Sequence, residues 1–213
     1  MSFLRAVLAS SALLVVGTSC TGEGARGGSN AGDPSVPEGS TSVSFDTSQA
    51  LSLGSGCPDK NLDVDVTATT TGLHLSFRQL RLDLAAGDTQ LSGLLACSVR
   101  VPFHAPSGHR VASVLGRLVY GVDKSAGASG MASSAVILSA TPTPLVSIEV
   151  PRGAAMSIPA LTYENRVQVD AACGASGILG INVNLSGRKE SVGEAMHLSV
   201  ASFDLDIELA PCP

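Results

Sequence analysis

Acidic side chains stand at every second position in two stretches of the sequence. Asp204, Asp206 and Glu208 alternate with apolar residues near the C-terminal end, and Asp63 and Asp65 do the same early in the chain. If these stretches are neighbouring strands, their carboxylates could converge on Ca²⁺, a hard cation that proteins bind through oxygen. They could also supply the acid and base of a glycosidase. We favour a solvated sheet face, because rows of surface charge are common. Its candidate cross-strand partners are Arg78, Arg81 and Arg166.

The segment from His104 to His109 is a second candidate, because Ser107 lies between its two histidines. Serine and histidine are the residue types of a nucleophile and its base. Ser107, however, is not in a Gly-x-Ser-x-Gly elbow, and no acidic residue is placed to orient a histidine. Two histidines on one loop also need further ligands to hold a metal. We therefore interpret the segment as an exposed polar turn, and expect His74 and His197 on outward strand faces.

A ladder of polar residues could hydrogen-bond to sugar hydroxyls. Asn182, Asn184 and Ser186 alternate with apolar residues. The simpler interpretation is the solvent side of a strand. The sequence has no phosphate-binding glycine loop, Rossmann fingerprint or CxxC pair, so we expect no cofactor, with Ca²⁺ as the alternative.

The N-terminal residues predict export. Arg5 precedes an apolar run over 6–16, followed by small residues up to Cys20, the layout of a secretory signal. The run is shorter than the roughly 20 residues that span a bilayer. Residues 16–20 resemble a bacterial lipoprotein processing box, although Gly17 stands where an aliphatic residue is usual. We predict a signal peptide over 1–19 and a lipid on Cys20; ordinary signal cleavage is the alternative.

The number of cysteines favours lipidation of Cys20. The chain has five cysteines, and lipidation of one leaves four for two disulfides in an oxidising compartment. Their spacing does not suggest zinc. We expect the pairs Cys57–Cys97 and Cys173–Cys212, although three pairings are compatible with the sequence.

Composition defines one domain behind a tether. Residues 21–42 are rich in Gly, Ser and Pro and have little to bury, so we expect disorder over 20–50 and a folded domain over 51–213. The net charge of −5 and the absence of a basic stripe make nucleic acid an improbable partner. With 3% aromatic residues and no Trp, the core must be aliphatic.

Alternating apolar residues predict an antiparallel β-sandwich of eight to ten short strands, with a closed β-barrel as the alternative. The clearest strands lie at 62–67, 73–84, 95–103, 114–122, 146–150, 167–171, 179–185 and 196–209. The alternation slips at 78–79 and at 201–202, and we place a β-bulge at each. Residues 136–138 predict a short strand, and 156–163 an irregular segment.

Several segments in order resemble the secreted "domain of unknown function 4360" family. They are Gly56-Cys57-Pro58, the strand at 73–77, the run from Cys97 to Pro106-Ser107-Gly108, the segment 173–182 that begins Cys-Gly-Ala, and the final Cys212. The resemblance covers about 54–212. Family strands are rich in aromatic residues, whereas this chain has no Trp and only two Tyr. The resemblance implies a secreted fold and brings no assigned activity or site residues.

Together these features predict a lipid-anchored extracytoplasmic domain of the cell envelope, on the outer membrane or the cell surface, with plain secretion as the alternative. We expect a non-catalytic binding or structural protein. Its candidate partners are the membrane, reached through the lipid on Cys20, and a glycan or an envelope protein. The alternative function is an extracytoplasmic hydrolase that uses the surface carboxylates or the loop of His104 and His109.

Overall fold

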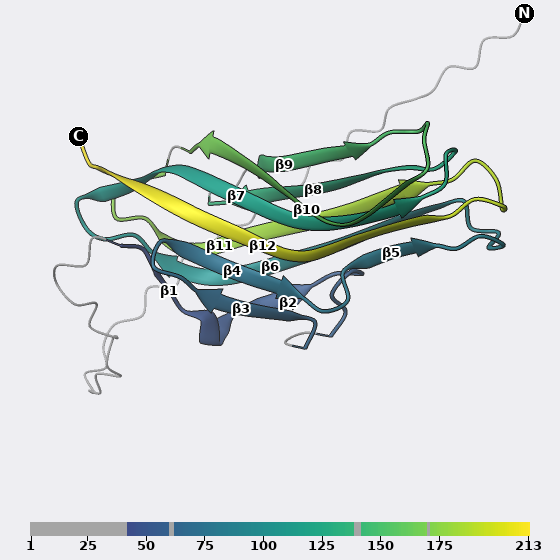
Figure 1. Ribbon diagram of the computed structural model, residues 1–213. Helices are drawn as coiled ribbons and strands as arrows, with labels where there is room; N and C mark the ends of the chain where they lie inside the picture. The colour runs from purple at the N-terminus through teal and green to yellow at the C-terminus, as the bar shows by residue number, and fades with distance from the viewer. Residues whose placement is uncertain (1–41, 60–61, 139–141, 170) are drawn as a thin grey trace, which may run out of the picture. The chain divides into compact units, whose positions relative to one another are not determined.

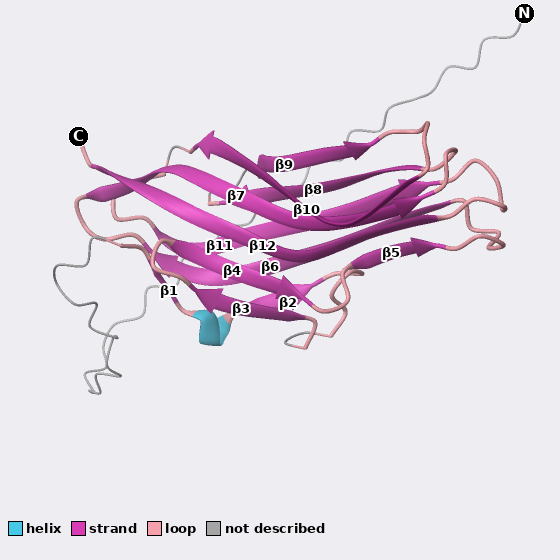
Figure 2. Cartoon of the chain, viewed as in Figure 1, coloured by secondary structure: helices cyan, strands magenta, loops and turns pink. Residues whose placement is uncertain are grey.

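The computed structural model describes residues 42–59, 62–138, 142–169 and 171–213 (Figure 1). These residues belong to one compact unit, 38–213. Strands make up nearly all of its regular structure, with one helical turn (Figure 2). The predicted signal peptide, Cys20 and the tether up to residue 41 lie outside the described residues. No helix in the described part is long and apolar enough to cross a membrane.

The strands form two six-stranded antiparallel sheets, which we name A and B. In sheet A the order is β1-β6-β11-β8-β9, with β2 also on β6. Its strands are β1 (Ser44–Phe45), β2 (Leu51–Leu53), β6 (Ser92–His104), β8 (Ser129–Ile137), β9 (Thr143–Val150) and β11 (Ser176–Arg188). In sheet B the order is β10-β7-β12-β4-β3, with β5 also on β12. Its strands are β3 (Val64–Ala68), β4 (Gly72–Phe77), β5 (Arg81–Leu84), β7 (His109–Lys124), β10 (Met156–Gln168) and β12 (Met196–Pro211).

The inner faces of the two sheets share one aliphatic core. Alternate residues of each long strand point inward, as the period of two requires. Leu179, Ile181 and Val183 from sheet A are fully buried, as are Phe203 and Leu205 from sheet B. The predicted antiparallel β-sandwich is therefore confirmed, and the alternative of a closed barrel is wrong because the two sheets remain separate.

The slips of alternation correspond to real irregularities. The register of β12 against β7 shifts between Val200 and Ser202, which confirms the bulge predicted at 201–202. A second shift in β12, between Glu208 and Leu209, was not foreseen. At 78–79 the chain does not form a bulge within one strand. It breaks into β4 and β5, which both pair with β12.

Residues 156–163, predicted to be irregular, belong to β10, so that prediction is wrong. β10 pairs along its length with β7, with a register shift between Ile158 and Leu161. It lies at the edge of sheet B, and most of its residues are exposed on both faces. An edge strand that buries so little shows no apolar alternation, so periodicity could not reveal it.

Regular structure also begins before residue 51. β1 and a 3-10 helix, η1 (Thr47–Gln49), lie in the segment assigned to the tether. Ser44 and Phe45 pair with the end of β6, and the side chain of Asp46 accepts a hydrogen bond from the backbone N–H of Ser48. The prediction of disorder up to residue 50 is thus too long at its C-terminal end.

Two disulfides fasten the unit, one in each half of the chain, with the predicted pairing. Cys57–Cys97 joins the segment after β2 to β6, and both sulfurs lie in the core, where the residues are 0% and 1% exposed. Cys173–Cys212 joins the segment before β11 to the residue after β12, and Cys173 is exposed. Disulfides of this kind are typical of an oxidising compartment.

Two buried lysines hold loops at one end of the sandwich. The ammonium of Lys189 donates hydrogen bonds to the backbone carbonyls of Ala85 and Asp88, the latter at 3.0 Å, and the residue is 1% exposed. Lys124, also buried, donates to the carbonyl of Ala154 at 2.9 Å. Each charge is therefore compensated by peptide dipoles of neighbouring loops.

Candidate functional site

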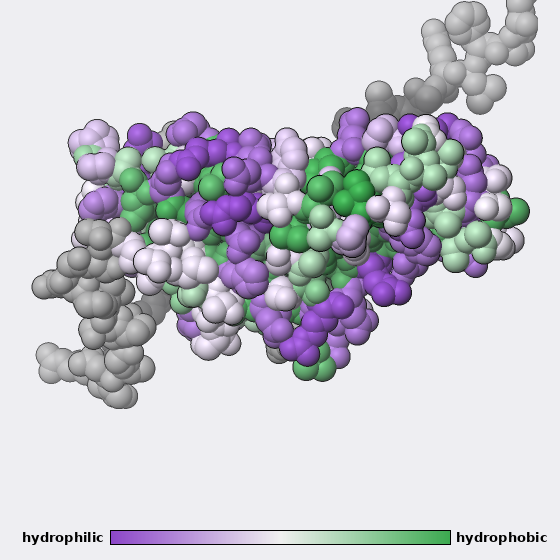
Figure 3. All heavy atoms as spheres, in the orientation of Figure 1, coloured by the Kyte–Doolittle hydropathy of each residue, from purple (hydrophilic) through white to green (hydrophobic). Residues whose placement is uncertain are grey.

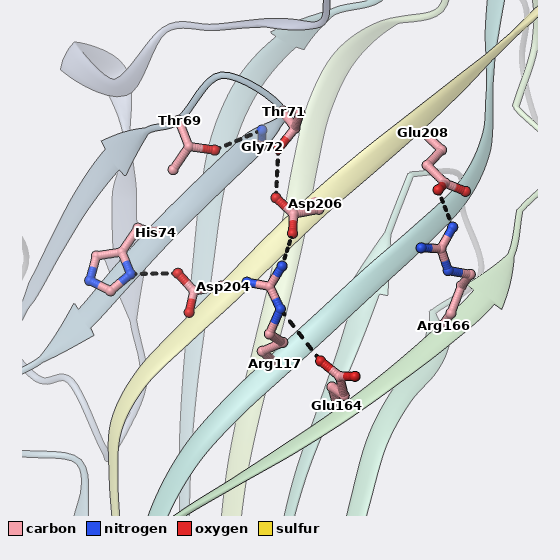
Figure 4. A network of polar contacts seen from close by, with 10 residues as sticks. All are labelled: Thr69, Thr71, Gly72, His74, Arg117, Glu164, Arg166, Asp204, Asp206 and Glu208. Carbon is pink, nitrogen blue, oxygen red and sulfur yellow. Dashed lines mark hydrogen bonds and ion pairs between the residues drawn. The ribbon is translucent and has the colours of Figure 1, made fainter.

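The outer face of sheet B carries the predicted row of carboxylates, and each is hydrogen-bonded to a side chain of another strand or turn (Figure 4). Asp204 lies 2.6 Å from Nδ1 of His74, its neighbour on β4. Asp206 forms an ion pair with Arg117 of β7 and accepts a hydrogen bond from Thr71 at 2.7 Å. We name this surface the sheet B face.

The third carboxylate of the row is fixed by two partners. Glu208 forms an ion pair with Arg166 of β10 and accepts a hydrogen bond from Ser113 of β7. The hydrogen bond from Arg166, followed by that from Ser113, holds the pKa of Glu208 below its ordinary value. Arg117 also reaches Glu164 of β10 at 3.6 Å. The row thus links four strands of the sheet through hydrogen bonds and ion pairs.

The two acidic stretches do not converge. β4 lies between β3 and β12, so Asp65 is separated from the row on β12 and pairs with Arg78 at 2.9 Å. Asp63 was expected on the outward face, but it is 5% exposed and accepts a hydrogen bond from the backbone N–H of Asp59. Its carboxylate stabilises the turn before β3. Within the described residues no three His, Cys, Asp or Glu side chains are grouped to hold a metal ion.

Of the three predicted arginine partners, Arg78 and Arg166 pair with predicted carboxylates. Arg81 pairs instead with Asp83 on its own strand, at 2.8 Å. Arg117, which sequence reasoning did not single out, takes the central place in the row.

A hollow of about 360 Å³ opens on the sheet B face over β5, β12, β7 and β10. Its polar lining comes from Arg81, Asp83, Asp123, Ser157, His197 and Ser199. Asp83, His197, Asp123 and Ser157 occupy one cross-strand row, because each is in register with the next. Figure 3 shows that hydrophilic residues gather in clusters, with apolar residues between them, on the visible face of the molecule.

A hydrogen bond orients two side chains of this row, His197 and Asp83. Nδ1 of His197 lies 2.9 Å from Asp83, and because a carboxylate only accepts, the histidine donates from this nitrogen. The hydrogen bond from His197, and next that from Arg81, lower the pKa of Asp83 despite its partial burial. Asp83 therefore stays ionised and holds both neighbours in place.

The floor of the hollow depends on Gly121. A Cβ at this position would come within 2.7 Å of the carbonyl oxygen of Pro159 and 3.0 Å of the hydroxyl of Ser199. Pro159 itself lies at the rim, exposed, where β10 shifts register against β7. Sequence reasoning missed this site because its residues come from four strands far apart in the chain. Of its lining residues, the sequence had indicated His197 on an outward face and Arg81 as a cross-strand partner on a sheet face.

The loop with His104 and His109 has the arrangement of a turn. It connects β6 of sheet A to β7 of sheet B, and Gly108 adopts φ = 73° there. Nδ1 of His109 lies 3.3 Å from the backbone carbonyl of Ser107, and the carbonyl of His104 accepts a hydrogen bond from Ser44. These contacts do not join the serine hydroxyl to a histidine ring.

The polar ladder of Asn182, Asn184 and Ser186 lies on the outer face of sheet A, as its alternation predicted. Asn182 is in register with Ser98 of β6 and Ala135 of β8, so small side chains flank it. We name this surface the sheet A face; it is defined by the outward residues of β2, β6, β8, β9 and β11.

A family model described as "Domain of unknown function (DUF4360)" matches residues 38–210. No match was found among curated proteins. Among solved structures, the chain is similar to the carbohydrate-binding module TmCBM61, solved with β-1,4-galactotriose. The identity is 14%, 76% of this chain and 90% of that chain are covered, and the TM-score is 0.30. It is also similar to the module CBM6cm-2 of Cellvibrio mixtus lichenase 5A, solved with cellotriose. There the identity is 12%, the coverage is 73% and 95%, and the TM-score is 0.24.

Proposed function

We propose that this chain, which belongs to the family described as Domain of unknown function (DUF4360), is a non-catalytic exported domain that binds a neutral glycan in the hollow of sheet B. One observation carries the proposal. Six polar side chains from four strands line a single hollow, and hydrogen bonds to Asp83 fix the directions of two of them, Arg81 and His197. Binding sites typically combine such convergent polar groups with a concave surface.

The polar groups suit hydroxyl groups better than ions. Arg81 donates, the carboxylates of Asp83 and Asp123 accept, and the hydroxyls of Ser157 and Ser199 do both. Hydrogen bonds to charged groups are stronger than those between neutral groups. Because Arg81 pairs with Asp83, much of the charge is balanced within the hollow. A neutral molecule with many hydroxyls matches this mixture, and the exposed ring of Pro159 offers an apolar surface for its C–H groups.

The lowered pKa values of two carboxyl groups favour binding over hydrolysis. A glycosidase needs one carboxyl group with a raised pKa, so that it remains protonated as the general acid. The pKa values of Asp83 and Glu208 are lowered instead, by the hydrogen bonds described above. We therefore favour the binding function over the hydrolase alternative.

The place of action in this proposal is the cell envelope. Cys20 carries the lipid, and the other four cysteines pair in two disulfides. A diacylglyceryl group with an N-acyl chain provides the multiple chains that stable anchoring requires. Labelling cells with a radioactive fatty acid tests the anchor: the wild-type chain takes up label and Cys20→Ala does not. Equal labelling of the wild-type chain and Cys20→Ala would refute the lipid anchor and favour a secreted protein.

Binding is tested with the processed chain carrying Cys20→Ser on an array of neutral and acidic oligosaccharides. Ser199→Phe places a ring in the hollow, and we expect it to weaken binding at least tenfold, about 1.4 kcal/mol. Ser76→Phe is the matched control, because Ser76 also lies on the sheet B face but does not line the hollow.

Two results would overturn this function. Equal binding by the Ser199→Phe and Ser76→Phe variants would place the ligand outside the hollow. Shortened oligosaccharides in a mass-spectrometric assay of the wild-type chain, lost in Asp123→Asn, would establish hydrolysis instead. Binding of an envelope protein but of no glycan would keep the non-catalytic role and refute the glycan.

A further inference from the structure

Exposed aliphatic side chains gather on the sheet A face. Half of the large hydrophobic residues that are exposed in the described part point outward from sheet A, according to their register. They are Leu51, Leu53, Leu94, Met131 and Ile178. Leu94 and Ile178 are 68% and 61% exposed. The other such residues lie in loops or in the inward register of β10, so none of them is on the sheet B face. The aliphatic residues of the sheet A face are spread along it, since the register positions of Leu94 and Ile178 on β11 are eight residues apart, and they supply its apolar contacts.

Two arginines on the same face have no partner among the described residues. Arg100 on β6 and Arg188 at the end of β11 are both exposed, and they make no hydrogen bond or ion pair there. Elsewhere in the described part the arginine side chains pair with carboxylates or have another partner. Unpaired guanidinium groups are therefore a property of the sheet A face.

Each of these arginines stands beside an exposed aliphatic side chain. Leu51 of β2 is in register with Arg100. Ser92, two residues before Leu94 on β6, is in register with Arg188. Eight residues of β11 separate the register positions of the two arginines, which places them roughly 27 Å apart along the strand. This spacing fits an extended flat partner better than a small ligand.

The charge of the face is opposite to that of the chain. Its outward residues include two arginines and one carboxylate, Glu149, whereas the whole chain has a net charge of −5. The rows of carboxylates lie on the sheet B face. An anionic surface is thus attracted to the sheet A face and repelled by the opposite one.

We propose that the sheet A face lies on an anionic phospholipid surface, with Arg100 and Arg188 against headgroup phosphates and Leu94 and Ile178 in the interfacial layer. Basic residues and apolar side chains together are the features of interfacial binding. The inference rests on the lipid anchor under "Proposed function", which keeps the domain at a high local concentration near the membrane, so that a weakly binding face suffices. The hollow on the opposite sheet then faces away from the bilayer.

The chain has no Trp, so a single introduced Trp reports the position of one face. The processed, lipidated protein is incorporated into phosphatidylglycerol/phosphatidylcholine vesicles that contain brominated phosphatidylcholine. Trp fluorescence is measured for Ile178→Trp and Leu94→Trp on the sheet A face. Thr162→Trp, outward on the sheet B face, is the matched control. We expect quenching for the first two variants only, and its loss when Arg100→Gln and Arg188→Gln are added or when phosphatidylglycerol is omitted.

The experiment distinguishes a wrong assignment of the lipid anchor from a wrong assignment of the docking face. If the protein floats with the vesicles but quenching is equal on both faces, or absent from the sheet A face, docking is refuted and the anchor stands. If the protein does not float, the anchor is refuted, and the same Trp variants at increasing lipid concentration decide the docking face alone. A blue shift of Ile178→Trp that depends on protein concentration without vesicles would identify a second copy as the occupant and overturn the lipid.

Discussion

The two disulfides close loops of similar length but differ in burial, and they should therefore respond differently to a reductant. Their sequence separations are 40 and 39 residues, so chain entropy predicts about 4 kcal/mol of stabilisation from each bond. Cys57 and Cys97 are buried, whereas Cys173 is exposed. The two bonds therefore stabilise the fold about equally through loop closure. A thiolate, however, reaches Cys173–Cys212 more easily than Cys57–Cys97.

We expect a mild reductant to reduce Cys173–Cys212 in the folded protein, and Cys57–Cys97 only when the sandwich opens. The assay adds dithiothreitol under native conditions, quenches aliquots by alkylation and identifies the modified cysteines by mass spectrometry. Urea should accelerate reduction of the buried pair strongly and of the exposed pair only slightly, because only the former requires opening of the core.

Equilibrium unfolding gives the magnitude. Cys173→Ser with Cys212→Ser should lower the free energy of unfolding by about 4 kcal/mol. Cys57→Ala with Cys97→Ala should cost more, since truncation of two buried side chains adds a cavity term. Equal rates of native-state reduction for both bonds, or a smaller loss from removing the buried pair, would refute this reasoning.

Three further outcomes are expected from urea unfolding. Lys189→Met leaves two loop carbonyls without their charged donor and should lower the free energy of unfolding by about 2–3 kcal/mol; an unchanged value would mean that the ammonium contributes nothing net. Gly72→Ala should cost at least about 3 kcal/mol, because its Cβ would lie 1.6 Å from the carbonyl oxygen of Leu205. Gly193→Ala, whose Cβ would lie 3.9 Å from the hydroxyl oxygen of Ser191, should be nearly neutral. The folded-state pKa of Glu208 is depressed, so its contribution is present above the unfolded pKa of about 4.3 and is lost as the pH falls through the lower folded value. The difference in unfolding free energy between wild type and Glu208→Gln should accordingly be measurable at pH 6 and vanish at low pH; a difference independent of pH would contradict the assigned ion pair.

The sandwich was predictable because its core strands alternate cleanly. Leu179, Ile181 and Val183 show the pattern, and all three are fully buried. The disulfide pairing followed from assigning one bond to each half of the chain. Residues 156–163 of β10 were missed because an edge strand with both faces exposed has no periodicity to detect, and the strand predicted at 167–171 overlaps only the end of β10. Asp63 was wrongly expected on the outward face because the alternating pattern suggested that the strand includes it. It precedes β3, and its carboxylate accepts a hydrogen bond within a turn.

The site was predictable only in part, for a different reason. The acidic row on β12 follows from the spacing of Asp204, Asp206 and Glu208 along one strand. Its partner Arg117 and the hollow around His197 depend on which strands are neighbours and in which register. Neighbours such as β5 and β12 are more than a hundred residues apart in the chain, and a period of two along one strand contains no information on that pairing.

β12, which follows the other described strands in the sequence, lies inside sheet B, where it pairs with β4, β5 and β7 (Figure 1). An incomplete chain therefore lacks the strand that joins the N-terminal hairpin of β3 and β4 to the rest of the sheet. Most contacts of this fold also connect distant residues, which makes folding slow. Sheet B is therefore complete only after β12 has been synthesised. For the exported protein proposed above, this order of assembly favours a chain that is still unfolded when it is threaded across a membrane.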